Sequence, residues 1–146
     1  MARTIFSAFW LLCLLIGPRV AVCDSVYTPR PGTTERAQIV RALRVAVAPD
    51  LGATVGPVKF VISRLSVQGD WAFLAATPQQ LNGRPFDYGG TKYEAMIEDG
   101  TFDDWLCALL RRQQGRWDVI AFEIGATDVP YAGWSEQYHA PPKIFP

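Results

Sequence analysis

Apolar residues along this chain fall into two pairs of runs, and a short polar break that contains glycine interrupts each pair. The clearer pair lies within residues 105–125 and surrounds Gln113-Gln114-Gly115-Arg116. The weaker pair, Phe60–Val67 and Trp71–Thr77, surrounds Gln68-Gly69-Asp70. Both breaks end in Q-G-x-W followed by an apolar run. This pattern is typical of β-hairpins, so we expect four antiparallel strands.

Successive side chains in a strand point to opposite faces, and in all four predicted strands both faces are apolar. Counting by twos gives the following opposed sets: Val58, Phe60 and Ile62 against Val61, Leu65 and Val67; Trp71, Phe73 and Ala75 against Ala72, Leu74 and Ala76; Trp105, Cys107 and Leu109 against Leu106, Ala108 and Leu110; and Trp117, Val119 and Ala121 against Ile120, Phe122 and Ile124. A sheet with one face in water would alternate with polar residues. Something must therefore cover each face.

A helix is predicted over residues 36–48, with Thr34 as its N-cap and Glu35 in its first turn. Ile39, Leu43 and Ala46 make one apolar stripe, which Val40 and Val47 widen, and 49–52 (P-D-L-G) ends the helix. The fold class predicted is therefore α+β: one long N-terminal helix packed on a four-stranded antiparallel meander sheet, as a single domain over residues 34–146.

One helix covers one face only, which leaves three candidates for the other face. The connection 78–103 is rich in glycine, proline and aromatic residues, and such long connections are usually lids or packed surface loops. Within it, Thr91-Lys92-Tyr93-Glu94 fits a capping box that opens a short helix through Ile97, although an extended segment fits equally well. The second candidate is the tail 125–146, where Asp128 is expected to cap a short helix that starts near Pro130. The third is a homodimer formed sheet to sheet.

The first 23 residues carry the pattern of a secretory signal peptide. Arg3 gives a positive start, 5–16 is an apolar run, and 21–23 (A-V-C) suits a signal peptidase. Because about twelve apolar residues are too few to span a bilayer, we expect cleavage after Cys23 and not an anchor. Lipidation at Cys23 is the alternative, but Val22 departs from the small residue that bacterial lipoproteins place there. The mature chain is then periplasmic or secreted, with an extended terminus at 24–33.

Charge and cysteine content narrow the function classes. The full chain has 14 basic and 14 acidic residues, and removal of Arg3 and Arg19 leaves 12 basic and 14 acidic, a net charge of about −2. This balance is not that of a nucleic-acid-binding domain, and we expect no membrane contact beyond the signal peptide. Cys107 would be the single cysteine of the mature chain, so an internal disulfide is excluded. Its place in an apolar strand predicts a buried, inert thiol.

The residues give little support for catalysis. The only histidine, His139, lies in a proline-rich tail, and no metal-binding, Walker, dinucleotide or G-x-S-x-G motif is present. Gly89-Gly90-Thr91 is too short for a phosphate cradle and predicts a turn. The acidic pairs at 98–99 and 103–104 are typical of solvated turns. We expect no cofactor and no metal.

Five residues stand out as candidates for ligand binding because they are aromatic or acidic and lie in the long connection, at strand ends or in the tail. They are Tyr88, Tyr93, Asp103, Glu123 and Trp134. By alternation Glu123 shares a face with Trp117 and Val119, where a structural ion pair with Arg64 or Arg111 is favoured over a functional role.

A helix followed by two hairpins with G-x-W at the strand starts resembles the cystatin-like α+β superfamily, which includes ketosteroid isomerase and nuclear-transport-factor-2-like domains. The resemblance covers about 34–125 and implies a curved sheet that wraps a helix and often forms a pocket. At closer range, 69–73 (G-D-W-A-F), 108–112 (A-L-L-R-R) and 125–134 (G-A-T-D-V-P-Y-A-G-W) resemble a family of small exported proteobacterial proteins. The isomerase's catalytic residues have no matching positions here, so its chemistry does not transfer.

These observations predict an exported binding or protein-interaction domain that is not an enzyme. The alternatives are a small pocket enzyme that uses carboxylates with Tyr88 or Tyr93, and a cystatin-like inhibitor that docks on another exported protein. A deep cavity lined by polar groups would favour the enzyme, whereas a filled core with aromatic loops would favour the interaction domain.

Overall fold

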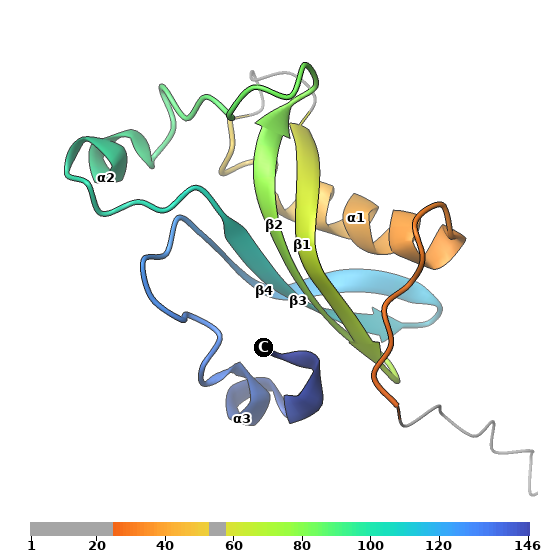
Figure 1. The fold of residues 1–146 in the computed structure, drawn as a ribbon. Helices are drawn as coiled ribbons and strands as arrows, with labels where there is room; N and C mark the ends of the chain where they lie inside the picture. Colours follow the sequence, from red (N-terminus) through yellow and green to blue (C-terminus); the bar gives the residue numbers. More distant parts are fainter. Residues whose placement is uncertain (1–24, 53–57) are drawn as a thin grey trace, which may run out of the picture.

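The computed structural model describes residues 25–52 and 58–146 (Figure 1). The predicted signal peptide, its cleavage site and Cys23 lie outside these residues. The described elements follow in the order α1 (Thr34–Val47), β1 (Val58–Gln68), β2 (Trp71–Gln80), α2 (Glu94–Glu98), β3 (Leu106–Gln113), β4 (Arg116–Ile124), α3 (Trp134–Tyr138) and the 3₁₀ helix η1 (Pro142–Ile144). None of the helices in this part of the chain combines the length and the apolar character needed to cross a bilayer.

The predicted meander is confirmed: the four strands pair antiparallel in the order β1-β2-β3-β4. Both hairpins close through two-residue turns, Gly69-Asp70 and Gln114-Gly115. Gln114 and Gly115 have φ of 50° and 77°, and positive φ at both central residues is the pattern of a type I′ turn. Strand β2 continues three residues past the predicted end at Thr77. Pro78 is tolerated there because β2 pairs with β3 only as far as Ala76.

Two irregularities in the ladder make part of the predicted face assignment wrong. The β1–β2 register shifts between Ile62 and Arg64, so Val58, Phe60 and Ile62 pack on the same side as Leu65 and Val67. A bulge inserts one unpaired residue, so the residues beyond it point to the opposite face from the one that simple alternation predicts. The predicted faces of β2 and β3 are confirmed by the two core clusters.

A second shift, between Leu109 and Leu110 on β3, falls opposite Ile120 on β4. As a result Trp117 and Val119, which precede it, pack on the same side as Phe122, which follows it. Ala121 pairs with Leu109 on the opposite face. The predicted opposition of the two β4 sets is therefore wrong for the same physical reason as in β1.

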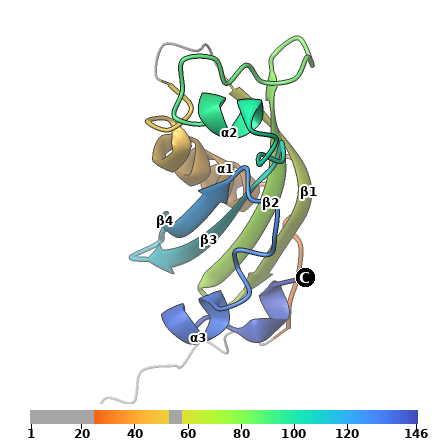
Figure 2. The same cartoon turned by 90° about the vertical axis from the view of Figure 1, so that its left-hand side faces the viewer.

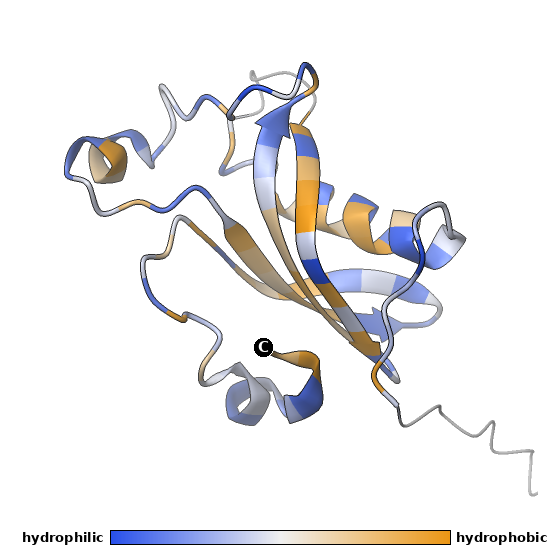
Figure 3. Ribbon diagram, in the orientation of Figure 1, coloured by the Kyte–Doolittle hydropathy of each residue, from blue (hydrophilic) through white to orange (hydrophobic). Residues whose placement is uncertain are grey.

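Helix α1 covers one face of the sheet, as predicted (Figure 1). Its buried residues are Ile39, Leu43 and Val47, each of which contributes about 1.5–3 kcal/mol when taken out of water. The N-cap is Thr33 and not Thr34: its side chain accepts a hydrogen bond from the backbone N–H of Arg36 at 3.4 Å. Gln38, Arg41 and Arg44 of α1 are exposed. The strands are mainly apolar in their middle parts (Figure 3).

Of the three candidate covers for the second face, the C-terminal tail is the one observed. Trp134, Ala140 and Ile144 pack with Phe73 and the other inward residues of that face. Cys107 lies in this cluster with no exposed surface, as predicted. The long connection instead lies at one end of the sheet, opposite the end that holds α3 (Figure 2). The predicted helix start near Pro130 is wrong, because α3 begins at Trp134 with Gly133 as its cap.

The two tryptophans of the Q-G-x-W motifs lie on opposite faces and are not equally buried. Trp117 is 3% exposed within the core under α1. Trp71 is only partly buried against the tail cluster, with the Arg111 guanidinium 5.0 Å from its ring centroid. Trp117 therefore anchors the core under α1, whereas Trp71 packs against the tail cluster and keeps part of its indole exposed.

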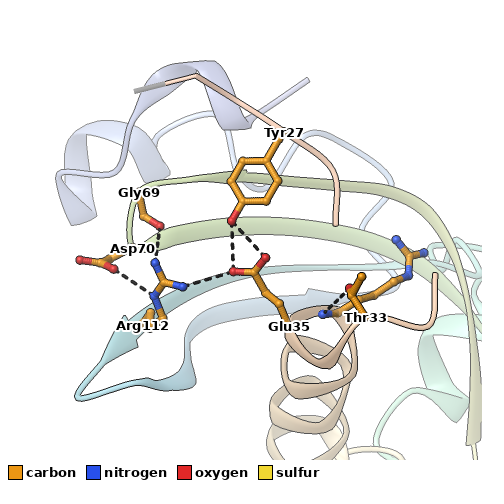
Figure 4. Close-up of polar contacts among 7 residues, drawn as sticks. Tyr27, Thr33, Glu35, Gly69, Asp70 and Arg112 are labelled. Carbon is orange, nitrogen blue, oxygen red and sulfur yellow. Dashed lines mark hydrogen bonds and ion pairs between the residues drawn. The ribbon is translucent and has the colours of Figure 1, made fainter. Parts of the chain in front are cut away.

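Arg112 ties the ends of both hairpins to α1 (Figure 4). Its side chain donates to the Asp70 carboxylate at 3.1 Å, to the Gly69 carbonyl at 3.2 Å and to the Glu35 carboxylate at 3.2 Å. The Tyr27 hydroxyl donates to the same Glu35 carboxylate at 3.0 Å. These charge-assisted bonds hold α1 in place over the sheet.

Candidate functional site

An aromatic cluster at the end of the sheet fixes the shape of the long connection between β2 and β3. The ring of Tyr88 lies in edge-to-face contact with Phe86, with centroids 4.9 Å apart, and with Phe102, at 4.7 Å. Tyr93 contacts Phe102 at 5.6 Å and Tyr88 at 6.1 Å. Such pairs prefer tilted or edge-to-face geometry and add stability beyond the area that they bury. The cluster joins the core under α1, so the connection is a packed part of the domain.

A pocket of about 470 Å³ opens on the outer side of this cluster. Three aromatic rings line it, those of Phe86, Tyr88 and Phe102. Four carboxylic acids also line it, at Asp87, Glu94, Glu98 and Asp104, and none of the described residues that line it is a lysine, arginine or histidine. The pocket therefore joins apolar ring surface with negative charge that no cation of its own lining offsets.

Hydrogen bonds hold three of the four carboxylates in place. The Tyr88 hydroxyl donates to Asp104 at 2.8 Å. The backbone N–H of Gly89 donates to Asp87 at 3.0 Å, and that of Gly90 donates to Glu94 at 3.1 Å. Glu98, at the end of α2, is exposed. The negative groups are thus largely preorganised, which lowers the entropic cost of binding a cation.

Tyr88 acts in this site as a neutral hydrogen-bond donor. Burial, the hydrogen bond to Asp104 and the charge of Asp104 raise the pKa of Tyr88 well above its usual range. The pKa of Tyr93 is also raised far above that range, first by burial and then by the charge of Asp50 and the hydrogen bond to it at 3.2 Å. Neither phenol ionises near neutral pH, which makes both poor general bases.

A second pocket of about 430 Å³, on the other side of Tyr93, already contains a cation of the protein's own. The Lys92 ammonium pairs with Asp50 at 2.8 Å and lies 5.2 Å from the centroid of the Tyr93 ring. Glu123 also lines this pocket. The same aromatic cluster therefore supports one cation between a ring and a carboxylate.

The Gly89-Gly90-Thr91 segment is a turn, as predicted, and all three of its backbone N–H groups have acceptors. Gly89 N–H donates to the Asp87 carboxylate and Gly90 N–H to the Glu94 carboxylate. Thr91 N–H donates to the Tyr88 carbonyl at 3.0 Å. The capping box is formed only in part. The Glu94 carboxylate binds the N–H of Gly90, and the cap of α2 is Tyr93, without a side-chain capping bond. A phosphate cradle at this turn is thus excluded.

The structure brings together only some of the residues that the sequence singled out. Tyr88 lines the acidic pocket and Tyr93 belongs to the same aromatic cluster. Asp103 is exposed and its neighbour Asp104 takes the place at the pocket. Trp134 is buried on the far face of the sheet, and Glu123 lies beside the second pocket. The sequence predicted Asp104 and Glu98 to be solvated turn residues. The only sequence signal for an acidic pocket was the high number of acidic residues in and beside this connection.

The predicted surroundings of Glu123 are wrong. Glu123 follows the bulge at Ile120 and pairs with Cys107. It therefore does not share the face of the sheet that holds Trp117. The two arginines expected as its partners make other contacts: Arg64 donates to the Phe145 carbonyl at 3.1 Å, and Arg111 stacks on a tryptophan. Within residues 25–52 and 58–146, none of the ion pairs involves Glu123.

Metal binding finds no support among the described residues, where no three histidine, cysteine or acidic side chains are grouped to hold an ion. No protein-family model, curated protein or solved structure matches the chain. The fold alone is therefore assigned: an α+β domain with one helix on a four-stranded antiparallel sheet.

Proposed function

We propose that this chain is an exported, non-enzymatic binding domain that holds an organic cation in the acidic pocket at the end of the sheet. The ligand class comprises primary amines, quaternary ammonium groups and guanidinium groups. One observation carries the proposal: three aromatic rings and four carboxylates line one pocket, and no basic side chain of the described residues lines it. Rings attract cations through their negative faces, and carboxylates add direct charge attraction.

Export is supported by the leader pattern of Arg3, the apolar run 5–16 and the small residues before Asp24. The order of one helix and two hairpins supports a cystatin-like relationship, and the tail motif supports the small exported proteobacterial family. Neither relationship supplies a function, because a shared fold hosts many. The raised pKa values of Tyr88 and Tyr93 speak against the alternative enzyme, which would need one of them to exchange protons near neutral pH.

The test compares choline with 3,3-dimethyl-1-butanol, which has the same shape but no charge. Nuclear magnetic resonance titration of the protein should show saturable binding of choline and much weaker binding of the neutral alcohol. Glu98→Gln should weaken choline binding about two- to fivefold, the range expected for one exposed charge. Asp99→Asn is the matched control, since Asp99 is adjacent and exposed but does not line the pocket. Equal binding of the two compounds, or equal effects of the two substitutions, would refute the proposal.

A further inference from the structure

A separate groove of about 660 Å³ lies between α1 and the first half of β4. Its lining combines apolar side chains with two arginines and one carboxylate, that of Asp118. The residues that matter here are Arg41, Val45 and Ala46 of α1 and Arg116, Trp117 and Val119 of β4. Val45 is 71% exposed, and Ile120 at the β4 bulge is 37% exposed. This part of the surface therefore presents apolar side chains from a helix and from a strand.

Strand β4 is an edge of the sheet. It pairs with β3 only, and neither isolated bridge among the described residues involves it. The backbone N–H of Arg112 donates to the backbone carbonyl of Asp70, on the β2 side of β3, at 2.7 Å. Because backbone groups alternate in direction along a strand, those of Arg111 point the other way, toward β4, where Arg111 pairs with Asp118. Alternation then turns the N–H and C=O of Trp117 and Val119 outward, away from β3. Both residues line the groove, which thus contains an unpaired strand edge.

Charge favours one kind of occupant. Arg116 is neutralised by Asp118, with Nε and carboxylate oxygen 3.1 Å apart. Arg41 is exposed and has no ion pair or hydrogen bond to any described residue. A free guanidinium beside an apolar strip matches a segment that carries an acidic side chain between apolar ones.

We infer that this groove binds an extended peptide segment of a partner protein, which adds to β4 as a fifth strand and places an acidic side chain at Arg41. Hydrogen bonds to the outward backbone groups of Trp117 and Val119 give affinity, as in other cases of strand addition. The apolar side chains of the segment lie over Val45 and Ala46, and the charge at Arg41 sets the register. This interaction is independent of the cation site, which lies in the β2–β3 connection.

The probe for the test is a synthetic ten-residue peptide of alternating valine and threonine with one central glutamate. Three matched peptides accompany it: one with lysine for glutamate, one N-methylated along the edge that would face β4, and one N-methylated along the other edge. Amide hydrogen exchange of the ¹⁵N-labelled protein is followed at Trp117 and Val119. The glutamate peptide should slow exchange at both amides, and the lysine peptide should bind about two- to fivefold more weakly.

Arg41→Gln should remove the preference for glutamate over lysine, whereas Arg84→Gln, the same charge loss in an exposed loop remote from the groove, should keep it. N-methylation should abolish binding on one edge of the peptide only. The inference is overturned if all peptides leave both amides unprotected, if both N-methylated peptides bind equally, or if lysine and glutamate peptides bind alike. Protection that grows with protein concentration in the absence of peptide would also overturn it, since the occupant would then be a second copy.

Discussion

Gly125 is the position where the packing of the proposed cation site can be tested with one methyl group. It has a φ of 81°, and a β-carbon there would overlap Cδ2 and Cε2 of the Phe102 ring. Two hydrogen bonds fix the backbone: Gly125 N–H donates to the Trp105 carbonyl at 2.9 Å and its carbonyl accepts from Asp103 N–H at 3.1 Å. Phe102 cannot retreat freely because it packs on Tyr88. Gly125→Ala therefore strains both the backbone and the ring.

The two contributions are separable by a matched control. Alanine in the left-handed region costs about 1–2 kcal/mol, and overpacking adds about 1–3 kcal/mol. Gly100 has a φ of 68°, and no neighbouring atom lies within 4 Å of the place that a β-carbon would take, so Gly100→Ala carries the first contribution only. Denaturant melts should show a loss of about 1–2 kcal/mol for Gly100→Ala and about 2–5 kcal/mol for Gly125→Ala.

A double-mutant cycle locates the second contribution at the ring. Phe102→Ala removes the atoms that the new methyl group would overlap, so Gly125→Ala should be less destabilising in that background than in the wild type. Gly125→Ala alone should also weaken choline binding, because the displaced ring forms a wall of the pocket. Equal losses of stability for Gly125→Ala and Gly100→Ala would refute the reasoning.

Further predictions concern the two core clusters. Trp117→Ala should lower the free energy of unfolding by about 3–5 kcal/mol, and Trp71→Ala by clearly less because its indole is only partly buried. The exposed His139 should matter little, so His139→Ala should cost less than about 1 kcal/mol. Denaturant melts measure all three variants, and similar losses for both tryptophans would contradict this prediction. Cys107 should react with thiol reagents only after unfolding, and rapid labelling of the native protein would show the burial to be wrong. Burial raises the pKa of the Cys107 thiol to about 12 from its ordinary 9.0. The thiol of the unfolded chain therefore ionises first, and the stability advantage of wild type over Cys107→Ala should be full below about pH 9 and shrink from about pH 9 to 12; an advantage constant over that range would contradict it.

The sequence was most informative where a regular repeat decides the structure. Apolar alternation and the two glycine-containing turns predicted four strands, and the 3.6-residue stripe around Leu43 predicted α1. Alternation failed at Ser63 and Ile120, because a bulge adds a residue without changing the local composition. The two apolar faces correctly predicted a second cover, but two segments of the chain and a homodimer met that requirement equally well.

The candidate site was less predictable because its contacts join residues that are distant along the chain. Tyr88 and Asp104 are 16 residues apart, and Tyr93 and Asp50 are 43 apart. Tyr88 and Tyr93 were recognisable as aromatic residues in a long connection. Nothing local distinguishes Asp104, which lines the pocket, from Asp103, which does not. That choice follows from which of the two carboxylates accepts the hydrogen bond of the Tyr88 hydroxyl, and this is Asp104.

The most direct test of the cation site is to find where choline binds. Nuclear Overhauser contacts between its N-methyl protons and the ring protons of the protein report distances within a few ångströms. We predict contacts to the rings of Tyr88, Phe86 and Phe102, lost in the presence of excess tetramethylammonium and absent with 3,3-dimethyl-1-butanol. Contacts to rings elsewhere in the protein, or equal contacts from the neutral alcohol, would contradict the account.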